Sequence, residues 1–238
     1  MKDYIIQNLD NAIENGYIKV YYQPVARTIS GEICGVEALA RWEDPEKGMI
    51  MPGDFIPVLE EAELIHKLDT EMIRLICRNY KKHRDLGHTM LPVSFNMSWL
   101  DFKKADMVAI LENEALECDM PRNMIRVEFT ESALAEDHEF MLDVFRRLDD
   151  AGFKVWMDDF GSGYSSLNIL KDVSFHTLKL DMEFLHDFSD RSKVIISSLI
   201  DMAKKVGVHT LAEGVETLEQ YEFLARVGCE KVQGYYFG

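Results

Sequence analysis

The sequence predicts an α/β fold, more specifically a modified TIM-type (β/α)8 barrel with one antiparallel strand. Short apolar runs rich in β-branched residues alternate with amphipathic stretches at helical spacing, a pattern typical of parallel sheets covered by helices. Eight such runs favour a closed barrel over an open sheet. The connection between the first two runs, residues 23–32, contains Gly and Ser and is too short for a crossover helix. These two strands should therefore form an antiparallel hairpin.

Each expected element rests on its own pattern. The strands are the apolar runs at residues 18–22, 33–39, 93–96, 125–129, 154–157, 177–180, 210–212 and 231–232. Between them, apolar side chains that recur every three to four residues predict crossover helices. The clearest apolar faces are Leu68, Met72, Leu75, Ile76 and Tyr80; Met141, Leu142, Phe145 and Leu148; and Ile195, Leu199, Met202 and Val206.

The composition suggests one large domain and excludes some partners. The chain has 238 residues, 47% of them hydrophobic, and no Pro- or Ser-rich linker, so a single domain over residues 1–238 is expected. A net charge of −16 leaves no broad basic surface for a nucleic-acid polymer but does not exclude a small anionic ligand. The cysteines are scattered, without a CxxC pair, which favours reduced thiols and a cytoplasmic location. No stretch approaches the ~20 apolar residues of a membrane span, and no membrane contact is expected.

Polar side chains stand at or just after the end of nearly every expected strand. In a barrel of this type the carboxyl ends of the parallel strands converge on one rim, where barrel enzymes place their chemistry. Residues far apart in the sequence should therefore meet there. They are Gln23, Glu37, Asn96, Glu128 with Glu131, Asp158 with Asp159, Lys179 with Asp181, Glu213 with Glu216, and Gln233.

The doublet Asp158–Asp159 is the most informative part of this set, because adjacent carboxylates repel each other unless a cation neutralises them. Carboxylates and an amide oxygen are hard ligands that suit Mg²⁺ or Mn²⁺, and none of the seven histidines has the HExxH spacing of a zinc site. Two ions about 3.5–4 Å apart, bridged by a carboxylate, are the usual arrangement for hydrolysing phosphate esters. Asp158 is the candidate for the bridge.

Each of these residues also has a simpler interpretation. A single Asp or Glu at a strand end is more often a helix N-cap or part of a surface ion pair, and Lys179 alone is more often a solvated strand end. Asn96 and Gln233 are as readily explained by hydrogen bonds to loop backbone. These interpretations become weaker when the residues are taken together, because unrelated structural roles would have to place all of them at the same rim by chance. The Asp-Phe-Gly within DDFG also suggests a protein kinase, but the GxGxxG loop, the VAIK lysine and the HRD loop are missing from the sequence.

Nine ordered motifs run over essentially the whole chain: YYQP, GVEALARW, GDFIP, FNMS, VEFTES, DDFGSGYSSL, LKLD, AEGVET and QGYYFG. With them the sequence resembles the EAL domain of bacterial cyclic di-GMP phosphodiesterases. The resemblance implies a barrel with one antiparallel strand, and hydrolysis of one phosphodiester bond of cyclic di-GMP to linear pGpG with two Mg²⁺ or Mn²⁺ ions. It also implies a homodimer and an intact control loop at GSGYSSL. Because the chain stops just after QGYYFG, it is expected to be excised from a larger protein with a fused regulatory domain.

Carried over motif by motif, the resemblance implies four sets of residues. The metal ligands would be Glu37, Asn96, Glu128, Asp158 and Asp159, with Asp158 bridging and Asp159 serving the second ion. Lys179 would orient or deprotonate the attacking water or act through its charge, and Glu213 would lie close to the metals. Glu131 and Ser162 would tie the DDFG loop to the neighbouring strand. The nucleotide would be lined or supported by Gln23, Glu37, Leu39, Arg41, Asn96, Asp181, Gly214, Glu216 and Gln233, with Arg41 suited to a phosphate or a guanine edge.

Two departures from the family pattern concern regulation more than chemistry. Glu63 stands where the family usually has Gly, which could alter a turn, and Met182–Glu183 stand where Arg-Ser is common, which could alter a loop or a dimer contact. The main alternative function is a non-catalytic cyclic di-GMP receptor or protein-interaction module. Such members commonly lose metal ligands, and this chain keeps them all. A weaker alternative is hydrolysis of a different phosphodiester.

Overall fold

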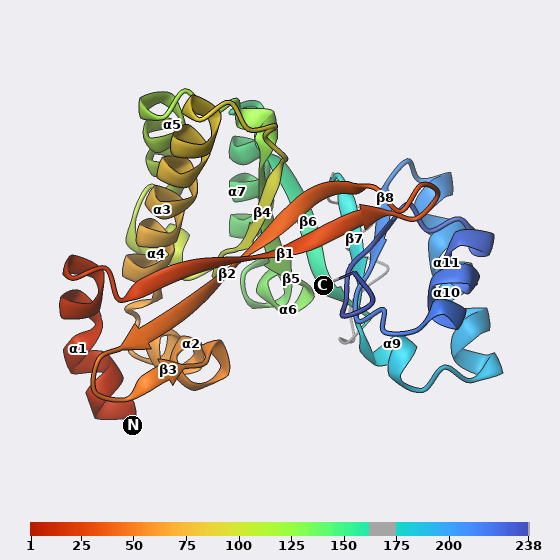
Figure 1. Cartoon of the computed structure of the whole chain (residues 1–238), viewed down its shortest axis with the longest axis horizontal. Helices are drawn as coiled ribbons and strands as arrows, with labels where there is room; N and C mark the ends of the chain where they lie inside the picture. The colour runs from red at the N-terminus through yellow and green to blue at the C-terminus, as the bar shows by residue number, and fades with distance from the viewer. Residues whose placement is uncertain (162–174, 238) are drawn as a thin grey trace.

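A closed barrel dominates the computed structural model, which describes residues 1–161 and 175–237 (Figure 1). The strand order is β1-β9-β8-β7-β6-β5-β4-β2-β3, and the pairing of β1 with β2 closes the barrel. The strands are β1 Ile18–Arg27, β2 Ile33–Asp44, β3 Gly48–Ile50, β4 Val93–Asn96, β5 Ile125–Thr130, β6 Lys154–Phe160, β7 Thr177–Leu180, β8 His209–Ala212 and β9 Lys231–Val232.

The direction of the strands confirms the predicted barrel with one antiparallel strand. β2 pairs in parallel with β4, and each neighbour from β4 round to β9 is also parallel. β1 alone among the barrel strands runs against both of its neighbours, β2 and β9. The short β3, which was not predicted, pairs antiparallel with the far end of β2 and extends the sheet beyond the barrel.

The hairpin strands are longer than the apolar runs predicted. β1 continues past Tyr22 to Arg27, and β2 continues past Leu39 to Asp44. Pro24 was expected to lie in the connection but sits inside β1, opposite Val36. The amide of Val36 donates to the carbonyl of Pro92 on the other side of β2, so the missing N–H of Pro24 leaves no partner unsatisfied there.

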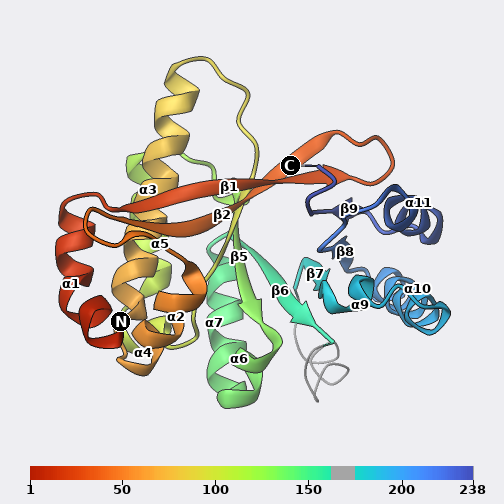
Figure 2. The ribbon, with the colours of Figure 1, turned by 60° about the horizontal axis from the view of Figure 1, so that its bottom comes forward.

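The β1–β2 ribbon crosses the whole molecule, from the neighbourhood of α1 to that of α11 (Figures 1 and 2). Its outer part covers a second hydrophobic core, in which Trp42 packs edge-on against Phe55 of α2. The main core lies between the barrel and its helices. The helices are α1 Lys2–Glu14, α2 Pro52–Glu61, α3 Ile65–Asp85, α4 Asp101–Lys104, α5 Met107–Glu117, α6 Glu131–Glu136, α7 His138–Asp150, α9 Glu183–His186, α10 Asp190–Lys205 and α11 Leu218–Val227, with a 3-10 turn at Arg122–Met124.

The predicted apolar faces hold for α3 and α7 but not for α10. On α10 the buried side chains are Ile196, Ile200 and Ala203, whereas Ile195 and Val206 are exposed. The prediction was wrong by one position because apolar residues occur on both sides of this helix. The small Ala203, which gives a weak hydrophobic signal, is the residue that allows close packing.

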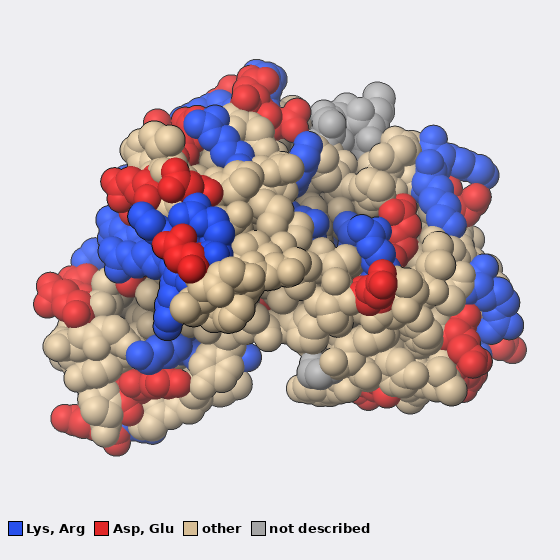
Figure 3. All heavy atoms as spheres, turned by 45° about the horizontal axis from the view of Figure 1, so that its top comes forward, with Lys and Arg blue, Asp and Glu red and all other residues tan. Residues whose placement is uncertain are grey.

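The distribution of charged side chains on the surface is consistent with the acidic net charge of the sequence. On the face drawn in Figure 3, acidic and basic side chains are interspersed and form no continuous basic surface. None of the helices in the described ranges combines the length and apolarity that a bilayer crossing requires.

Candidate active site

A buried lysine surrounded by carboxylates lies inside the carboxyl-end rim of the barrel. The Nζ atom of Lys179, on β7, is 2.6 Å from Glu128 Oε2, 2.9 Å from Glu213 Oε1, 3.0 Å from Asp158 Oδ1 and 3.6 Å from Glu37 Oε2. Its side chain is 1% exposed. Four strands or strand ends distant in sequence thus converge on one ammonium group, as the strand-end pattern predicted.

The amide side chains of the site hold Glu37 from both sides. Asn96 Nδ2 donates to Glu37 Oε1 over 3.1 Å, and Gln233 Nε2 donates to Glu37 Oε2 over 2.5 Å. Gln233 Nε2 also donates to Gln23 Oε1 over 2.9 Å. Glu37 and Gln23 lie inside their strands rather than at the ends predicted for them, and they meet because they are paired in the antiparallel β1–β2 register.

The aspartate doublet faces the site because β6 is irregular at this point. Successive residues of a strand normally point to opposite faces. The pairing of β6 with β7 shifts register between Met157 and Phe160, and Asp159 has a φ of 53°. This bulge brings carboxylate oxygens of Asp158, Asp159 and Glu213 within 4.8 Å of one another. A non-glycine residue in the left-handed region costs conformational energy, and such strain is often found at functional sites.

The crowding of carboxylates shifts their protonation. Burial, followed by the charges of Asp158 and Asp181, raises the pKa of Asp159 to about 6. Burial together with neighbouring carboxylates raises the pKa of Glu213 to about 8 and that of Glu128 well above its usual range, although Lys179 partly offsets both shifts. Burial alone would lower the pKa of Lys179, but the surrounding carboxylates outweigh it and raise that pKa well above its usual range.

The residues of the site fit a hard divalent cation. Carboxylates outnumber the single ammonium group, and carboxylate and amide oxygens are the donors that Mg²⁺ and Mn²⁺ prefer. Among the described residues, Glu128 Oε1 and the carbonyl oxygen of Gln233 are buried and lack a hydrogen-bond partner. Unpaired buried oxygens of this kind are costly unless something binds them.

A cavity of about 420 Å³ opens beside the carboxylates. It contains six of the nine residues predicted to bind the nucleotide and Glu213, together with Tyr21, Tyr22 and Tyr235. Glu216 is held at its wall because its amide donates to the side chain of Gln220, a residue of the capping box that starts α11. The six predicted residues are Gln23, Leu39, Arg41, Gly214, Glu216 and Gln233.

Asp181 does not line that cavity. It lies on a separate one of about 390 Å³ with Gly161 and Arg191, and its carboxylate accepts a hydrogen bond from the amide of Glu183. It still contributes to the site electrostatically, since its charge helps to raise the pKa of Asp159.

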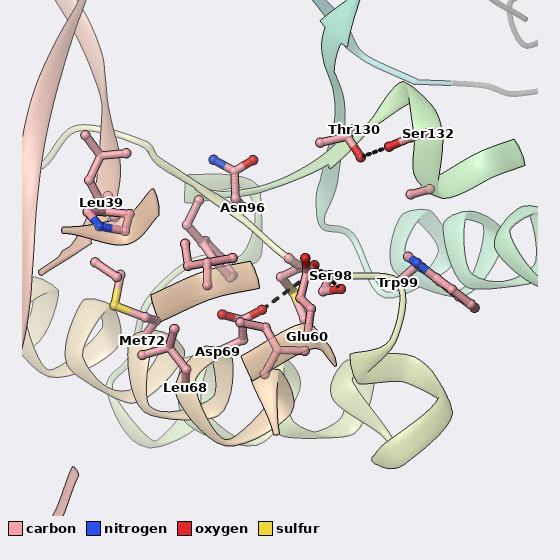
Figure 4. Close-up of a pocket in the computed structure, with 18 residues that line it drawn as sticks. Leu39, Glu60, Leu68, Asp69, Met72, Asn96, Ser98, Trp99, Thr130 and Ser132 are labelled. Carbon is pink, nitrogen blue, oxygen red and sulfur yellow. Dashed lines mark hydrogen bonds between the residues drawn. The ribbon is translucent and has the colours of Figure 1, made fainter. Parts of the chain in front are cut away.

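A second large cavity, of about 520 Å³, shares Leu39 with the first (Figure 4). Asn96 and Leu39 join it to the carboxylate cluster, and Glu60, Asp69 and Trp99 line it further out. These three residues were not predicted, because two lie on helices and one on a loop, away from strand ends. The one sequence signal for any of them is that Glu60 follows shortly after the GDFIP motif.

The loop after β4 is fixed to this cavity by a pair of buried acids. The amide of Ser98 donates to Asp69 and to Asp101, and its hydroxyl donates to Glu60 over 2.8 Å. Burial raises the pKa of Asp69 to about 6, and burial with the charge of Asp69 raises that of Asp101 to about 11. The three hydrogen bonds from Ser98 therefore hold the chain next to Asn96.

The loop-anchoring prediction can be followed on one side only. Glu131 Oε2 accepts a hydrogen bond from the amide of Gly161 over 3.1 Å, which joins the start of α6 to the end of the DDFG segment. Ser162 and most of the predicted control loop lie outside the described residues.

The two departures have local structural consequences. Glu63 adopts a φ of 55°, the left-handed conformation that glycine prefers, and its carboxylate pairs with Lys104. Met182 packs against Gly214, where an added Cβ would lie 2.6 Å from the Met182 Cβ. The turn is therefore retained with Glu63 in place, and Met182 forms part of the wall of the 420 Å³ cavity.

Comparisons with known proteins agree with this picture. A family model described as the EAL domain matches residues 6–238. MucR of Pseudomonas aeruginosa, named a bifunctional diguanylate cyclase/cyclic di-GMP phosphodiesterase, is 34% identical over 236 residues, which are 98% of this chain and 34% of that protein. PdeR of Escherichia coli, named a cyclic di-GMP phosphodiesterase, is 35% identical over 97% of this chain and 35% of its own length.

A solved structure described as the PaMucR phosphodiesterase in complex with c-di-GMP is also similar. It has a TM-score of 0.91 and 33% identity, and the match covers 99% of this chain and 96% of that one. The chain spans about a third of the length of the curated relatives MucR and PdeR.

Proposed function

The chain belongs to the EAL domain family, and we propose that it hydrolyses one phosphodiester bond of cyclic di-GMP to give linear pGpG. The observation that carries the proposal is the carboxylate cluster around Lys179, of which Glu213 lines the 420 Å³ cavity. Asn96, which donates to Glu37 of the cluster, lines the 520 Å³ cavity. Relatives named cyclic di-GMP phosphodiesterases, and a similar structure described as a c-di-GMP complex, support the choice of substrate.

Two Mg²⁺ or Mn²⁺ ions are part of the proposal. Glu37, Asn96, Glu128 and Asp158 would hold one, while Asp158 and Asp159 would hold the other. Glu213 would lie next to both ions, because its carboxylate lies close to those of Asp158 and Asp159. Bound ions would lower the pKa of a water and neutralise charge on the phosphate.

Lys179 then acts through its charge rather than as a base. While no metal is bound, the carboxylates around it raise its pKa well above its usual range, which favours the charged form. An ammonium group at this position attracts the attacking oxygen and the phosphate, and it also limits repulsion among the carboxylates. Glu213 Oε1 lies 2.9 Å from the ammonium group of Lys179, where it is placed to accept a hydrogen bond from an attacking water.

The two cavities suit a ligand built of two similar halves. Leu39 lines both, so a cyclic dinucleotide laid across it would place one base in each and its phosphate near the carboxylates. Arg41 lies in the wall of the 420 Å³ cavity and offers a planar guanidinium to a phosphate or a guanine edge. Glu60 and Asp69 in the other cavity are acceptors for the N–H groups of a guanine.

The wider setting belongs to the proposal as well. We infer that residues 1–238 act as one phosphodiesterase domain, joined to a regulatory domain and working as a cytoplasmic homodimer. The length of the relatives, about three times that of this chain, supports the fused domain.

The deciding experiment is an assay of the purified chain with cyclic di-GMP, with and without Mg²⁺ or Mn²⁺, in which pGpG is resolved by chromatography. We expect pGpG only when the metal is present. Glu37→Ala should abolish it, while Glu46→Ala, an exposed glutamate near the end of the same strand, serves as the matched control. Binding without turnover at saturating Mn²⁺ would instead indicate a receptor, and preference for another phosphodiester would change the substrate.

A further inference from the structure

One face of the β1–β2 ribbon runs from the carboxylate cluster onto the wall of the 420 Å³ cavity. In the antiparallel register Gln23 lies opposite Glu37, and Tyr21 lies opposite Leu39. Alternate residues of a strand share a face, so Arg41 and Glu43 follow Glu37 and Leu39 outward along this row. The row therefore carries a cation and an anion next to each other at the cavity.

Tyr21 lies between these two charges. Its hydroxyl donates to Glu43 Oε1 over 3.0 Å, and the guanidinium carbon of Arg41 is 5.7 Å from the centre of its ring. Arg41 Nη1 also donates to the carbonyl of Ala40 over 2.8 Å. In the part of the chain that the structure describes, no carboxylate oxygen comes within 4.0 Å of the nitrogens of Arg41.

The missing ion pair is informative because Arg41 and Glu43 could reach each other. Residues two apart on a strand are separated by only ~7 Å on the same face, and side chains of this length pair readily across that distance. Glu43 accepts from the tyrosine instead, and this hydrogen bond raises the pKa of Tyr21. The ring meanwhile lies beside the guanidinium, and Arg41 lines the 420 Å³ cavity, where its N–H groups can reach a ligand.

We propose that Tyr21 is a positioning residue that holds Glu43 away from Arg41 and so keeps the guanidinium available to the substrate. The proposal rests on the proposed function, in which Arg41 contacts the dinucleotide. Tyr21 takes no part in the chemical step. Its effect should therefore appear in KM and leave kcat nearly unchanged.

Tyr21→Phe tests the role of the hydroxyl while keeping the ring over Arg41. Without the hydroxyl, Glu43 is free to pair with Arg41 and compete with the substrate, so KM for cyclic di-GMP should rise about two- to fivefold, the range expected from an exposed ion pair. The double variant Tyr21→Phe/Glu43→Gln removes the competing charge and should restore KM. Glu43→Gln alone should not raise KM, and Glu46→Gln is the control for loss of a nearby surface charge.

Three kinetic results would overturn the proposal: an unchanged KM in Y21F, a double variant that stays as impaired as Y21F, or a fall in kcat in place of a rise in KM. A crystal structure of Y21F provides a test that needs no activity, with Arg41 and Glu43 expected within 4.0 Å of each other, the distance at which ion pairs are assigned. If the wild-type protein neither hydrolyses nor binds cyclic di-GMP, the proposed function has failed. The Y21F structure then still decides whether Tyr21 keeps the two charges apart, and separated charges would refute it.

Discussion

Two layers of the barrel interior, two residues apart on the same strands, treat buried charge in opposite ways. The upper layer contains Glu128, Asp158, Lys179 and Gln233, and the lower layer contains Arg126, Trp156, Thr177 and Lys231. In the upper layer the lysine is surrounded by carboxylates. In the lower layer, Arg126 and Lys231 each lie 4.7 Å from the centre of the Trp156 ring, and among the described residues no carboxylate oxygen is within 4.0 Å of them.

The difference shows how one set of strands serves both binding and stability. The upper layer has an excess of negative charge and unpaired buried oxygens, which favour binding of cations and cost stability while no cation is bound. The lower layer is closed by Trp156, which is 2% exposed and packs with Val25 and Leu211. Variants of the upper layer should therefore change catalysis, and variants of the lower layer should change stability.

Glu128→Gln, in the upper layer, should have the largest effect of the predicted variants, and this effect should be on activity. A small effect would contradict the contrast between the two layers. The variant removes a proposed metal ligand and a partner of Lys179, so activity toward cyclic di-GMP should fall at least about 10³-fold. Thermal stability without metal should stay equal or rise, because Lys179 keeps its three other carboxylate partners while one crowded buried carboxylate is replaced by a neutral group of the same shape. Steady-state kinetics and a melting curve give both values. Activity close to wild type would refute the assignment.

Trp156→Ala should have the next largest effect, on stability. Loss of the ring leaves a cavity and two cations without their aromatic contact, and the free energy of unfolding should fall by about 3–5 kcal/mol. Urea denaturation measures this change. Trp156→Phe, which keeps most of the volume, should lose much less, and its kcat should remain close to wild type. A large loss of kcat in the Phe variant would mean that the layers are not separable.

Addition of Mn²⁺ should distinguish the two layers, because the ion should bind only the carboxylates of the upper layer. A ligand that binds only the folded state at 100 times its Kd stabilises that state by about 2.7 kcal/mol. The melting temperature should therefore rise with Mn²⁺ in the wild type and in Trp156→Phe. Asp158→Asn should abolish the rise, because it removes the proposed bridging ligand. An equal rise in Asp158→Asn would place the metal elsewhere.

Lys231, in the lower layer, should make stability depend on pH. This effect should be smaller than those of the preceding variants. Burial, followed by the charge of Arg126, lowers its pKa to about 8, whereas an unfolded lysine titrates near pH ~10.4. Between these values the unfolded state binds more protons at this lysine, so the Lys231 contribution to stability should rise as the pH rises from about 8 to about 10. The buried thiols Cys77 and Cys229, whose pKa values are raised by burial, act in the opposite direction in both proteins, so the effect is read as a difference between the wild type and a Lys231 variant. Lys231→Met should lack this contribution, and at neutral pH it should be more stable than the wild type by about 3 kcal/mol, the value for a pKa difference of that size. Chemical denaturation at several pH values tests this, and identical profiles for both proteins would contradict it.

The sequence allowed the fold to be predicted wherever burial and alternation coincide. The runs at β4, β7 and β9 were located with their observed bounds, because each is short and a polar residue, Asn96, Asp181 or Gln233, marks its carboxyl end. The hairpin was placed correctly but drawn too short, since Pro24 resembles a turn residue and its harmless position depends on which side of β2 carries the amide of Val36. The inverted face of α10 has a similar origin, because the sequence does not show which of two apolar sides meets the barrel.

The residues of the candidate site could be predicted from the sequence better than their arrangement in space. The strand-end pattern and the motifs brought Glu37, Glu128, Asp158 and Lys179 to one place. The bulge that turns both aspartates inward requires a left-handed Asp159, and a sequence gives no signal for such a conformation at a residue other than glycine. The cavity lined by Glu60 and Asp69 was missed because helix positions gain a role there only through tertiary packing.

The pairing of β1 with β9 has a consequence for how the protein is made. Ala26 pairs with Val232, and Gln233 bonds to Gln23 and Glu37, positions separated by 210 and 196 residues. Contacts of such long range form late, because the entropy of closing the loop is lost before they contribute. On the ribosome β1 therefore keeps one edge unpaired until Val232 has emerged. The nascent chain holds most of its core before it holds a complete active site.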